Sequence, residues 1–457
     1  MTPPRPFPMS TPDSAWVRME DLTNPMTITG LIGFGARIPR ADFERFWDER
    51  IVPFDRFRMR VEGAASASPR WVPEPDYATA HHFHDADLPA PADREALQAL
   101  VSRLMSEPLS FERSPWSVHY VPEVTNDDGT VGSAAVVRLH HCIGDGIALM
   151  HVVLSAADEM FSTDSLPASR PKRALVPVRE RSLATLSGAL AETRDLLLRP
   201  AHLAERLTAA ASGAKAAVGL LAMRPDSDTV FKGDASADKR AAWTHVFPLA
   251  RVRGVAEASG TKINDVLMAA ATGGLRRYLL DAGEPVEGVG VRAAVPVNVR
   301  PLDRASELGN SFGLAFLLLP VALESPGERL AEVKRRMDAL KGSAQPGLVF
   351  LILQSIGRAP RWLHTQVVDM FSQKASIVMT NVPGPTSEIH MGGGAVRSLM
   401  FWVPQAGDIG LGLSILSYNG EVRVGICADA AYVADPNRLV AAFEAEFEAL
   451  AQHVVRA

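Results

Sequence analysis

The chain has 457 residues and a formal net charge of −5. This length exceeds what one hydrophobic core usually supports, so it predicts two large domains, and the slightly acidic balance excludes nucleic acid as a partner. Its 2 cysteines, Cys142 and Cys427, are too few for a disulfide framework, which indicates a reducing compartment such as the cytoplasm.

The first residues argue against export and against membrane insertion. Residues 1–8 are rich in proline and lack the apolar core of a secretory signal. No stretch of the sequence approaches the roughly 20 apolar residues that span a bilayer. A short helix is then predicted around Ala15, with Asp13 as its cap, and residues 24–32 have the composition of a strand.

Three histidines, His81, His82 and His84, resemble a metal cluster at first sight. However, His81 and His82 are adjacent and cannot easily share one ion, and no array of cysteine or aspartate residues accompanies them. We therefore predict a strand with surface histidines at this place, and no metal.

Pro115 and Trp116 open a stretch of alternating apolar and polar residues, which predicts the entry into a strand. Two interpretations of Trp116 stay open: it is either a core residue or part of the wall of a binding pocket.

The most informative stretch is the heptapeptide His140-His141-Cys142-Ile143-Gly144-Asp145-Gly146. A short, partly β-branched apolar run predicts a strand that ends near Leu139, and apolar residues at helical spacing predict a helix over 147–157. The heptapeptide is then a tight turn between strand and helix. Gly144 and Gly146 are expected to adopt backbone conformations that are costly for residues with a Cβ atom.

The residue types of this turn suit proton transfer. Neutral imidazole accepts a proton near neutral pH, and the rings of adjacent His140 and His141 point in different directions, so only one is expected to reach a substrate. Asp145 is expected to hold the turn rigid by bonding its backbone or an arginine. Cys142 is not expected to be a nucleophile, because its neighbours supply a base for a substrate hydroxyl instead.

Residues 166–240 are predicted to be a helical linker. Within them, residues 183–223 are rich in alanine and leucine, and Pro200 would divide them into two helices. These helices are interpreted either as a connector packed across two domains or as an amphipathic surface that docks on lipid.

Polar stretches mark three places in the second half. Asn264 or Asp265 is predicted to cap the helix that follows. Arg300 ends a predicted strand and is either solvated or a bidentate partner for Asp145. Residues 309–313 match Gly-x-Ser-x-Gly, but a strand is predicted directly after them, whereas the nucleophile elbow of serine hydrolases requires a helix there.

A strand over residues 376–381 leads into Val382-Pro383-Gly384-Pro385. Two prolines and a glycine fix an irregular loop, which is expected to be a place where the chain crosses between domains.

These stretches resemble a known group of enzymes. The heptapeptide resembles the active-site signature of the CoA-dependent acyltransferase superfamily, which includes chloramphenicol acetyltransferase and peptide-synthetase condensation domains. Nearly the whole chain resembles one branch, the bacterial wax ester synthase/acyl-CoA:diacylglycerol acyltransferase family. This resemblance also rests on Asn-Asp at 264–265, Gly-Asn at 309–310 and Thr-Asn-Val-Pro-Gly-Pro at 380–385. The chain has Ser-Pro-Trp at 114–116 where that family usually shows Pro-Leu-Trp.

The resemblance implies an α/β (α+β) fold of two chloramphenicol-acetyltransferase-like domains. Each would be a mixed sheet flanked by helices, with an active-site tunnel at their interface. The expected domains are 1–165, which carries His-His-x-x-x-Asp-Gly, the helical linker 166–240, and 241–457.

The resemblance also implies roles for single residues. His141 is the expected general base, His140 and Asp145 complete the catalytic motif with Asp145 as its structural acid, and Asn264 is expected beside the catalytic histidine. Arg300 and Gly144 are expected to be structural. The residues expected to contact substrate are Gly146, Pro115, Trp116, Gly309, Asn310, Asn381, Pro383 and Gly384.

The implied activity is direct transfer of a long-chain acyl group from acyl-CoA to an alcohol, which gives triacylglycerol from diacylglycerol or wax ester from a fatty alcohol. Acyl-CoA is the co-substrate, and neither a cofactor nor a metal is expected. A condensation-type acyltransferase with another acceptor and a non-catalytic lipid- or membrane-binding protein are the alternatives. The expected location is the cytoplasm, with peripheral association with the inner membrane or lipid inclusions.

Overall fold

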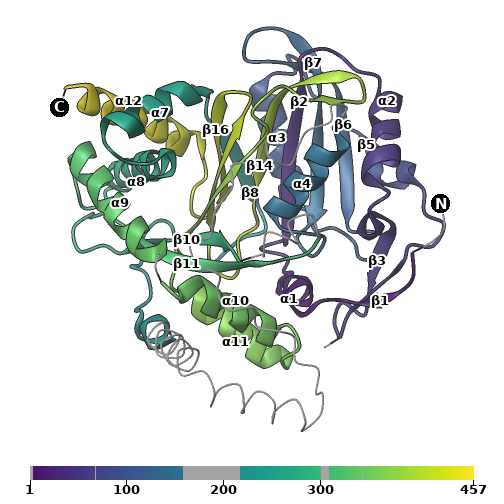
Figure 1. Cartoon of the computed structure of the whole chain (residues 1–457), viewed down its shortest axis with the longest axis horizontal. Coiled ribbons are helices and arrows are strands. Elements are labelled where there is room, and N and C mark those ends of the chain that lie inside the picture. The colour runs from purple at the N-terminus through teal and green to yellow at the C-terminus, as the bar shows by residue number, and fades with distance from the viewer. Residues whose placement is uncertain (1–3, 67, 158–216, 300–307, 342, 457) are drawn as a thin grey trace, which may run out of the picture.

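The computed structural model describes residues 4–66, 68–157, 217–299, 308–341 and 343–456. In this part of the chain, two large β-sheets lie side by side and helices flank both of them (Figure 1). This is the mixed α/β architecture that the sequence predicts.

The sheet of the N-terminal half has six strands in the order β13-β14-β2-β7-β6-β5. Its strand β7 (Val131–His140) lies between β2 and β6 and ends at the first residue of the heptapeptide. Residues 134–137 of β7 are all buried, which explains why this strand reads as a continuous apolar run. The other strands are β2 (Thr27–Phe34), β5 (Phe83–Asp85), β6 (Trp116–Thr125), β13 (His390–Met391) and β14 (Gly394–Trp402).

Helix α1 (Thr11–Met19) begins earlier than expected. Its cap is Ser10, whose Oγ accepts a hydrogen bond from the Asp13 backbone N–H at 3.2 Å, so the prediction of Asp13 as the cap was wrong. The other helices of this half are α2 (Arg40–Phe46), α3 (Arg94–Met105) and α4 (Gly146–Ala156). Three short helical turns (Trp47–Ile51, Asp55–Arg58, Thr79–His82) and a small sheet of β1 (Phe7–Pro8), β4 (Arg70–Pro73) and β3 (Met59–Glu62) complete it.

The sheet of the C-terminal half has seven strands, with the main order β11-β10-β12-β15-β16-β8 and β9 paired to β16. Helices α8 (Ile263–Asp281) and α12 (Asn437–Arg456) pack together and share a hydrophobic core with this sheet. Helices α10 (Gln345–Ile356) and α11 (Arg361–Ser372) lie below β10 and β11 in Figure 1. The remaining elements are β8 (Lys239–Trp243), β9 (Phe247–Pro248), α7 (Leu249–Ala258), β10 (Val291–Asn298), β11 (Phe312–Leu319), α9 (Pro326–Lys341), β12 (Ile377–Pro383), β15 (Leu411–Tyr418) and β16 (Glu421–Asp429).

The chain crosses from one sheet to the other directly after Pro383. Strand β12 lies in the C-terminal sheet, and β13 and β14 complete the N-terminal sheet beside β2. The next strand, β15, belongs to the C-terminal sheet again and pairs with β12. The crossing is therefore where the irregular loop predicted it. Two strands of the N-terminal sheet, β13 and β14, thus come from within the range 241–457 that was expected to form the other domain.

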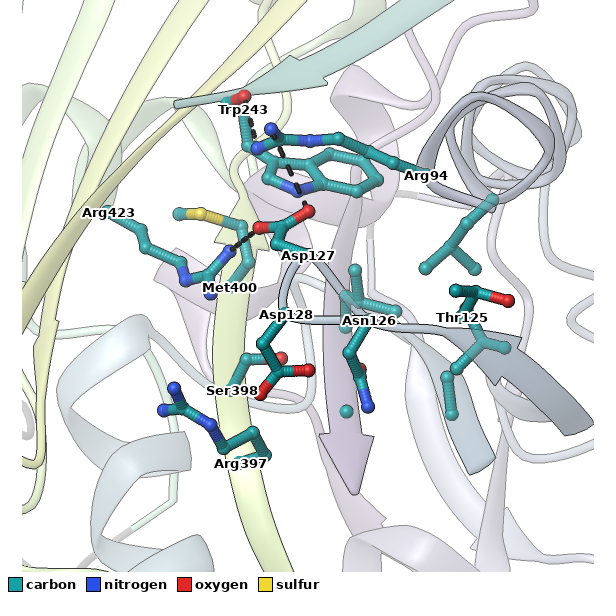
Figure 2. A pocket seen from close by; sticks show the side chains of 15 residues that line it. Arg94, Thr125, Asn126, Asp127, Asp128, Trp243, Arg397, Ser398, Met400 and Arg423 are labelled. Carbon is teal, nitrogen blue, oxygen red and sulfur yellow. Dashed lines mark hydrogen bonds and ion pairs between the residues drawn. The ribbon is translucent and has the colours of Figure 1, made fainter. Parts of the chain in front are cut away.

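Polar contacts fasten the two halves at the far ends of β6 and β7. The Arg94 guanidinium donates to the carbonyl oxygens of Trp243 and Thr244 at 2.9 and 2.7 Å. Asp127, in the turn between β6 and β7, lies 3.4 Å from Arg423 of β16 and 3.9 Å from Arg94 (Figure 2). Here the hairpin turn of one half touches a strand of the other.

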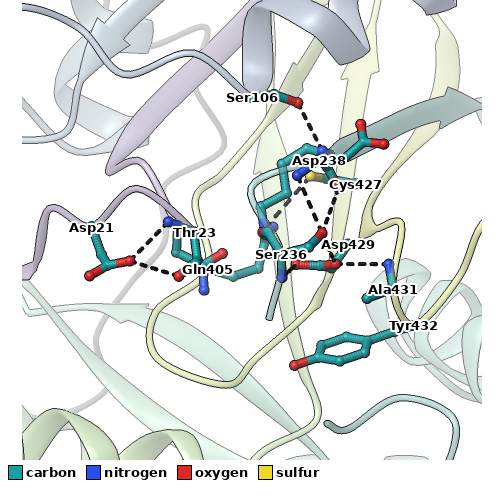
Figure 3. Close-up of polar contacts among 12 residues, drawn as sticks. Asp21, Thr23, Ser106, Ser236, Asp238, Gln405, Cys427, Asp429, Ala431 and Tyr432 are labelled. Atoms are coloured by element: carbon teal, nitrogen blue, oxygen red, sulfur yellow. Dashed lines mark hydrogen bonds and ion pairs between the residues drawn. The ribbon is translucent and has the colours of Figure 1, made fainter. Parts of the chain in front are cut away.

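A second fastening point lies where α3 meets β8 (Figure 3). The backbone N–H of Lys239 donates to Ser106 Oγ at 2.8 Å. The Lys239 ammonium is buried and donates to Asp429 at 2.8 Å, and Ser236 donates to the same carboxylate through its backbone N–H and its Oγ.

Two other expectations meet the structure differently. Helix α8 starts at Ile263 rather than Val266, and the Asp265 carboxylate accepts from the Lys262 backbone N–H at 3.1 Å. Most of the expected linker helices fall in 158–216, outside the described residues. Among the helices that are described, none has the length and apolar character needed to cross a membrane.

Candidate active site

His141 lies at the turn between β7 and α4, at one end of an apolar cavity. Its side chain is 5% exposed, and its ring stacks on Trp16 of α1 with centroids 4.0 Å apart and planes 13° apart. The Phe312 ring lies 5.7 Å away on another side. The imidazole thus packs against two aromatic rings, one from each half of the chain, whose own centroids are 5.7 Å apart.

Asn310 determines which ring nitrogen of His141 carries the proton. The Nδ1 atom lies 2.8 Å from Asn310 Oδ1, while the Asn310 amide nitrogen donates to Asp13 Oδ1 and to the His141 carbonyl oxygen, both at 2.8 Å. Because the amide nitrogen is engaged as donor, Oδ1 is the acceptor and Nδ1 carries the proton. The other nitrogen, Nε2, is then an acceptor.

A buried ion pair holds Asn310 in turn. Asp13 is fully buried and also accepts from the Asn310 backbone N–H at 3.1 Å, and its second oxygen accepts from the Arg56 guanidinium at 2.9 Å. Arg56 also donates to the carbonyl oxygens of Cys142 and Ile143 at 2.9 Å. The chain Arg56–Asp13–Asn310 therefore orients His141 and supports the turn that follows it.

The surroundings keep the imidazole neutral. Burial lowers the pKa of His141 from 6.5 to about 4, although the nearby Asp145 carboxylate opposes this shift. At neutral pH the ring is therefore unprotonated and can accept a proton from a bound hydroxyl.

His140 points away from the cavity and is fully buried. Its Nδ1 accepts from the Cys142 backbone N–H at 3.1 Å, and its Nε2 lies 3.3 Å from Glu20. Of the two histidines only His141 lines the cavity, as the argument from ring direction expected. Because His140 faces the turn and Glu20, the structure gives it a supporting position.

Asp145 connects the turn to the C-terminal half. One carboxylate oxygen accepts from the Ala148 backbone N–H at 2.9 Å and so caps α4, and the other accepts from the Ser311 backbone N–H at 2.9 Å. The Asp145 backbone N–H donates to the Gly309 carbonyl oxygen at 3.2 Å. The two carboxylate bonds thus go to the first turn of α4 and to Ser311, whereas the predicted arginine partner, Arg300, lies outside the described residues.

The glycines of the heptapeptide do not serve the purpose expected of them. Neither Gly144 nor Gly146 has a positive φ, so the prediction of a special backbone conformation was wrong. A Cβ atom at Gly146 would lie 3.6 Å from Val382, in the wall of the cavity. In contrast, Gly309, which contacts the Asp145 backbone, requires the conformational freedom of glycine. Its φ is +131°, and a Cβ atom there would lie 3.4 Å from the Arg56 guanidinium.

The cavity has a volume of about 170 Å³ and lies between the two halves. Strands β10, β11 and β12 form its floor, and α10 and α11 form a wall. Its lining is mainly apolar, and its few polar members include His141, Asp145, Asn298, Thr380 and Asn381. Such a site suits a hydrocarbon chain whose reacting end meets His141.

The expected substrate contacts separate into two groups. Gly146 and Asn381 line the cavity, and the Asn381 amide donates to Asn264 Oδ1 at 3.0 Å, so Asn264 contacts a residue of the lining. Asn310 is buried beneath His141 and Gly309 beside Asp145, where both support the catalytic turn.

The other four expected contacts lie elsewhere. Trp116 is 2% exposed, its Nε1 donates to Phe57, and it stacks on His82 at 4.2 Å, so it is a core residue and the pocket-wall interpretation was wrong. Pro115 accepts from the His140 backbone N–H at 2.9 Å. Pro383 and Gly384 belong to the crossing point, where the Gly384 backbone N–H donates to Ser417 at 2.9 Å.

The structure also bears on three further predictions. His82 is buried rather than on a strand surface, with its ring nitrogens 3.0 Å from the Trp116 carbonyl oxygen and 3.1 Å from Glu74. Cys142 is fully buried, which raises the pKa of its thiol, as befits a residue that is no nucleophile. Strand β11 follows Ser311 directly, so the Gly-x-Ser-x-Gly match is not a nucleophile elbow.

Sequence reasoning missed three residues of the site: Trp16, Asp13 and Arg56. Asp13 was interpreted only as a cap, and nothing in its neighbourhood indicates a contact with Asn310, 297 positions away. The only sequence signal is an aspartate beside a tryptophan in a short helix, which many unrelated helices share.

Comparisons with known proteins place the whole chain in one family. The model of the wax ester synthase/diacylglycerol acyltransferase catalytic domain matches residues 9–267, and that of the C-terminal domain of the same family matches 308–451. The probable diacylglycerol O-acyltransferase tgs1 of Mycobacterium tuberculosis is 28% identical over 449 residues, which cover 95% of this chain and 94% of that one. The putative diacylglycerol O-acyltransferase Mb3154c of Mycobacterium bovis matches to the same extent.

Solved structures show the same fold. A wax ester synthase/diacylglycerol acyltransferase from Marinobacter aquaeolei VT8 superposes with a TM-score of 0.67 at 21% identity, covering 98% of this chain and all (100%) of that one. The first condensation domain of the calcium-dependent antibiotic synthetase superposes with a TM-score of 0.59 at 15% identity, covering 99% and 97%.

Fold and site together define an acyltransferase with the two-domain architecture of condensation domains. Within that class, the chain belongs to the wax ester synthase/diacylglycerol acyltransferase family, whose catalytic-domain model alone matches more than half of it.

Proposed function

We propose that this enzyme moves an acyl group from acyl-CoA to the hydroxyl of a lipophilic alcohol, with His141 as the general base. The acceptor is diacylglycerol, a long-chain alcohol, or both. The observation that carries the proposal is the position of the His141 ring, whose Nδ1 is fixed by Asn310 at one end of an apolar cavity.

The reaction follows from this geometry. Nε2 of His141 takes the proton from the acceptor hydroxyl, and the oxygen attacks the thioester carbonyl to form a tetrahedral intermediate. The intermediate collapses, the carbon–sulfur bond breaks, and the departing CoA thiolate takes the proton back from the imidazolium. Because the base acts on the acceptor directly, the scheme requires neither a covalent acyl-enzyme nor a cofactor.

The buried setting supports each step. Asn310 Oδ1 accepts a hydrogen bond from the Nδ1–H of His141, so the imidazolium formed after proton transfer keeps its orientation. The apolar lining excludes water, which would otherwise hydrolyse the thioester. Asn264 remains a proposed donor to the oxyanion, and its contact with Asn381 supports the proposal, because Asn381 itself lines the cavity.

A thiol-release assay tests the proposal. Purified protein is given acyl-CoA with hexadecanol or diacylglycerol, and the ester is identified by mass. We expect His141→Ala to lower turnover by about 10²-fold to 10⁴-fold, because that is the usual contribution of a general base. Near-normal ester synthesis by a folded His141→Ala protein would contradict the mechanism.

The same assay separates the alternatives. Wild-type protein that binds lipid but releases no thiol with any alcohol would favour the non-catalytic interpretation. Thiol release with an amine acceptor and with neither alcohol would favour a condensation-type reaction.

We also propose that the enzyme works at a membrane or lipid-inclusion surface. Leu22, which follows α1 three residues after its end, is 72% exposed, and Trp362 of α11 is 64% exposed with Leu363 beside it. Arg358 and Arg361 are exposed at the same corner, next to the helices that form the wall of the cavity. An aromatic ring and aliphatic side chains flanked by arginines suit an anionic lipid surface.

Vesicle flotation tests this second proposal. A Trp362→Ala/Leu363→Ala variant is expected to float less with phosphatidylglycerol vesicles than the wild type. Leu280→Ala is the matched control because this leucine is also exposed (49%) but belongs to α8, which lies apart from α10 and α11 in Figure 1. Equal flotation of all three proteins would contradict the assignment of this corner.

A further inference from the structure

The floor of the cavity is built in three successive ranks of side chains. In the antiparallel pair β10–β11, Asn298 lies opposite Phe312, Pro296 opposite Leu314, and Ala294 opposite Phe316. All six line the cavity, because every second residue of a strand points to the same face. Val378 of β12 joins the third rank, since it pairs with Ala294 in parallel register.

The ranks give the cavity a direction. Phe312 begins the series next to the reacting end, with its ring 5.7 Å from that of His141. Phe316 lies four positions further along β11, which corresponds to about 13 Å at the usual rise of a strand. The chain of a substrate that enters at His141 therefore runs along the strand toward Phe316.

A pair of stacked rings closes the third rank. Phe316 of β11 and Phe371 of α11 lie parallel, with centroids 5.9 Å apart and planes 5° apart, and Phe316 is 5% exposed. Ala294 and Ile409 are buried in the same small hydrophobic cluster. The pair spans the gap between the floor strand and the helix that walls the cavity.

The next rank pairs Arg292 of β10 with Leu318 of β11, and its arginine ends the apolar surface on the β10 side. Arg292 lies two positions before Ala294 on the same strand face, and its guanidinium donates to Asp226 at 2.5 Å. The Asp226 carboxylate is buried and also accepts from the Arg292 backbone N–H and from Ser376 Oγ at 2.8 Å. A hydrocarbon chain that passed the third rank would have to disturb this ion pair, which is costly.

We propose that the Phe316–Phe371 pair, backed by the Arg292–Asp226 ion pair, sets the upper limit on the length of the acyl chain. The inference rests on the proposed function in one respect, namely that the acyl chain of the thioester occupies this cavity. Chains that end before the third rank fit without rearrangement, whereas longer ones must displace the rings.

The test measures the acyl-length profile of kcat/KM over a series of saturated acyl-CoAs, with one fixed alcohol. Phe316→Ala and Phe371→Ala open the end of the cavity and are expected to raise the ratio of kcat/KM for longer over shorter chains by at least about 10-fold, which is the lower bound for a methylene in an apolar pocket. Ala294→Leu fills the third rank and is expected to shift the optimum to shorter chains.

Leu318→Ala is the matched control. Leu318 lies two positions beyond Phe316 on the same strand face, and it is 37% exposed, so its removal should leave the profile unchanged. If Phe316→Ala does not fold, Phe316→Leu keeps most of the apolar volume while it removes the stacked ring, and it is expected to shift the profile in the same direction.

Two outcomes would overturn the proposal. One is an active Phe316→Ala or Phe316→Leu enzyme, together with Phe371→Ala, whose acyl profile equals that of the wild type. The other is a variant in which kcat/KM depends on the length of the alcohol differently from the wild type, measured with one acyl-CoA, while its dependence on acyl length is unchanged. The cavity would then hold the acceptor. Wild-type protein that is inactive with every acyl-CoA would instead refute the proposed function.

Discussion

At the scale of single residues, the Asn310 amide determines the tautomer of His141 and so leaves Nε2 as the nitrogen that can accept a proton. Asn310→Ala removes the acceptor of the Nδ1 proton and leaves Asp13 with one partner fewer. We expect kcat to fall by about 10²-fold or more with little change in KM, because wrong tautomers and ring orientations disable a base without touching the binding surface.

Steady-state kinetics with the wild type, Asn310→Ala and Asn126→Ala check this expectation. Asn126 is a fitting control because its amide bonds Thr130 in the β6–β7 turn, at the opposite end of β7 from His141. A folded Asn310→Ala enzyme with normal kcat would show that the amide does not orient the base.

The buried imidazole also predicts the pH dependence. Because the pKa of His141 is lowered to about 4, the base stays neutral well below 6.5, so the acid limb of kcat/KM should lie below pH 6. The unfolded chain takes up this proton near 6.5 and the folded one does not, so the same group makes the free energy of unfolding decrease as the pH falls from 6.5 toward 4.

The Trp16→Ala variant tests whether burial is the cause of the lowered pKa of His141. Without the stacked indole the ring becomes more hydrated, so the pKa of His141 should rise and the acid limb should move toward 6.5. An acid limb near 6.5 in the wild type, or one that Trp16→Ala leaves in place, would contradict burial as the cause.

Sequence reasoning at this scale identified residues of the site but not how they support one another. Because the heptapeptide is contiguous, residue types alone indicated that one of its two histidines reaches a substrate, and the family resemblance specified His141. Asn310 is 169 positions from His141, and Asp13 is 297 from Asn310. Contacts over such separations depend on how the sheets pack, which local patterns do not encode.

At the scale of elements, the crossing after β12 is held by a close backbone approach. A Cβ atom at Gly384 would lie 2.5 Å from the Ser417 carbonyl oxygen, so Gly384→Ala must push β12 away from β15. We expect the free energy of unfolding to fall by about 1–3 kcal/mol, the usual cost of overpacking.

Chemical denaturation of Gly384→Ala and Gly254→Ala compares a crowded glycine with an open one. Gly254 lies within α7, and a Cβ there meets nothing within 4 Å, so the alanine should stabilise the helix by about 0.5–1 kcal/mol. Equal effects at both positions would mean that β12 tolerates the extra atom.

Elements were predictable where a strong local pattern coincides with burial. Strand β7, the turn and α4 fall within a residue of their expected bounds, because apolar periodicity and the Asp145 cap act together. The starts of α1 and α8 were placed too late, since Ser10 and Lys262 precede the polar residues that looked like caps.

At the scale of the whole molecule, the two-sheet architecture was predictable from resemblance and the crossing from its prolines. The origin of β14 was not. In the sequence, residues 394–402 come between two strands of the C-terminal sheet, yet they pair with β2 of the N-terminal sheet. Strand partners at such separation are chosen by the available sheet edge and not by the composition of the strand.

The ion pairs at the two fastening points should differ in strength: Asp127–Arg423 joins the two halves, whereas Lys239–Asp429 joins β8 to β16 within the C-terminal sheet. The Asp127–Arg423 pair is partly exposed (36% and 14% of the side chains), so Asp127→Asn should cost about 1 kcal/mol or less and lose its effect at high salt. Lys239 and Asp429 are almost completely buried (3% and 0%), so Lys239→Met leaves an unpaired carboxylate and should cost about 3 kcal/mol or more.

Chemical denaturation of both variants at low and at high salt compares the two losses in the free energy of unfolding. The Lys239→Met loss should persist in salt, and Asp429→Leu added to it should recover only part of the stability, because the donors of Ser236 and Ala431 then lose their acceptor. A larger loss for Asp127→Asn than for Lys239→Met would contradict the difference between a partly exposed and a buried ion pair. The opposite order means that the Lys239–Asp429 pair holds β8 on β16, the position from which β8 docks on α3 through Ser106.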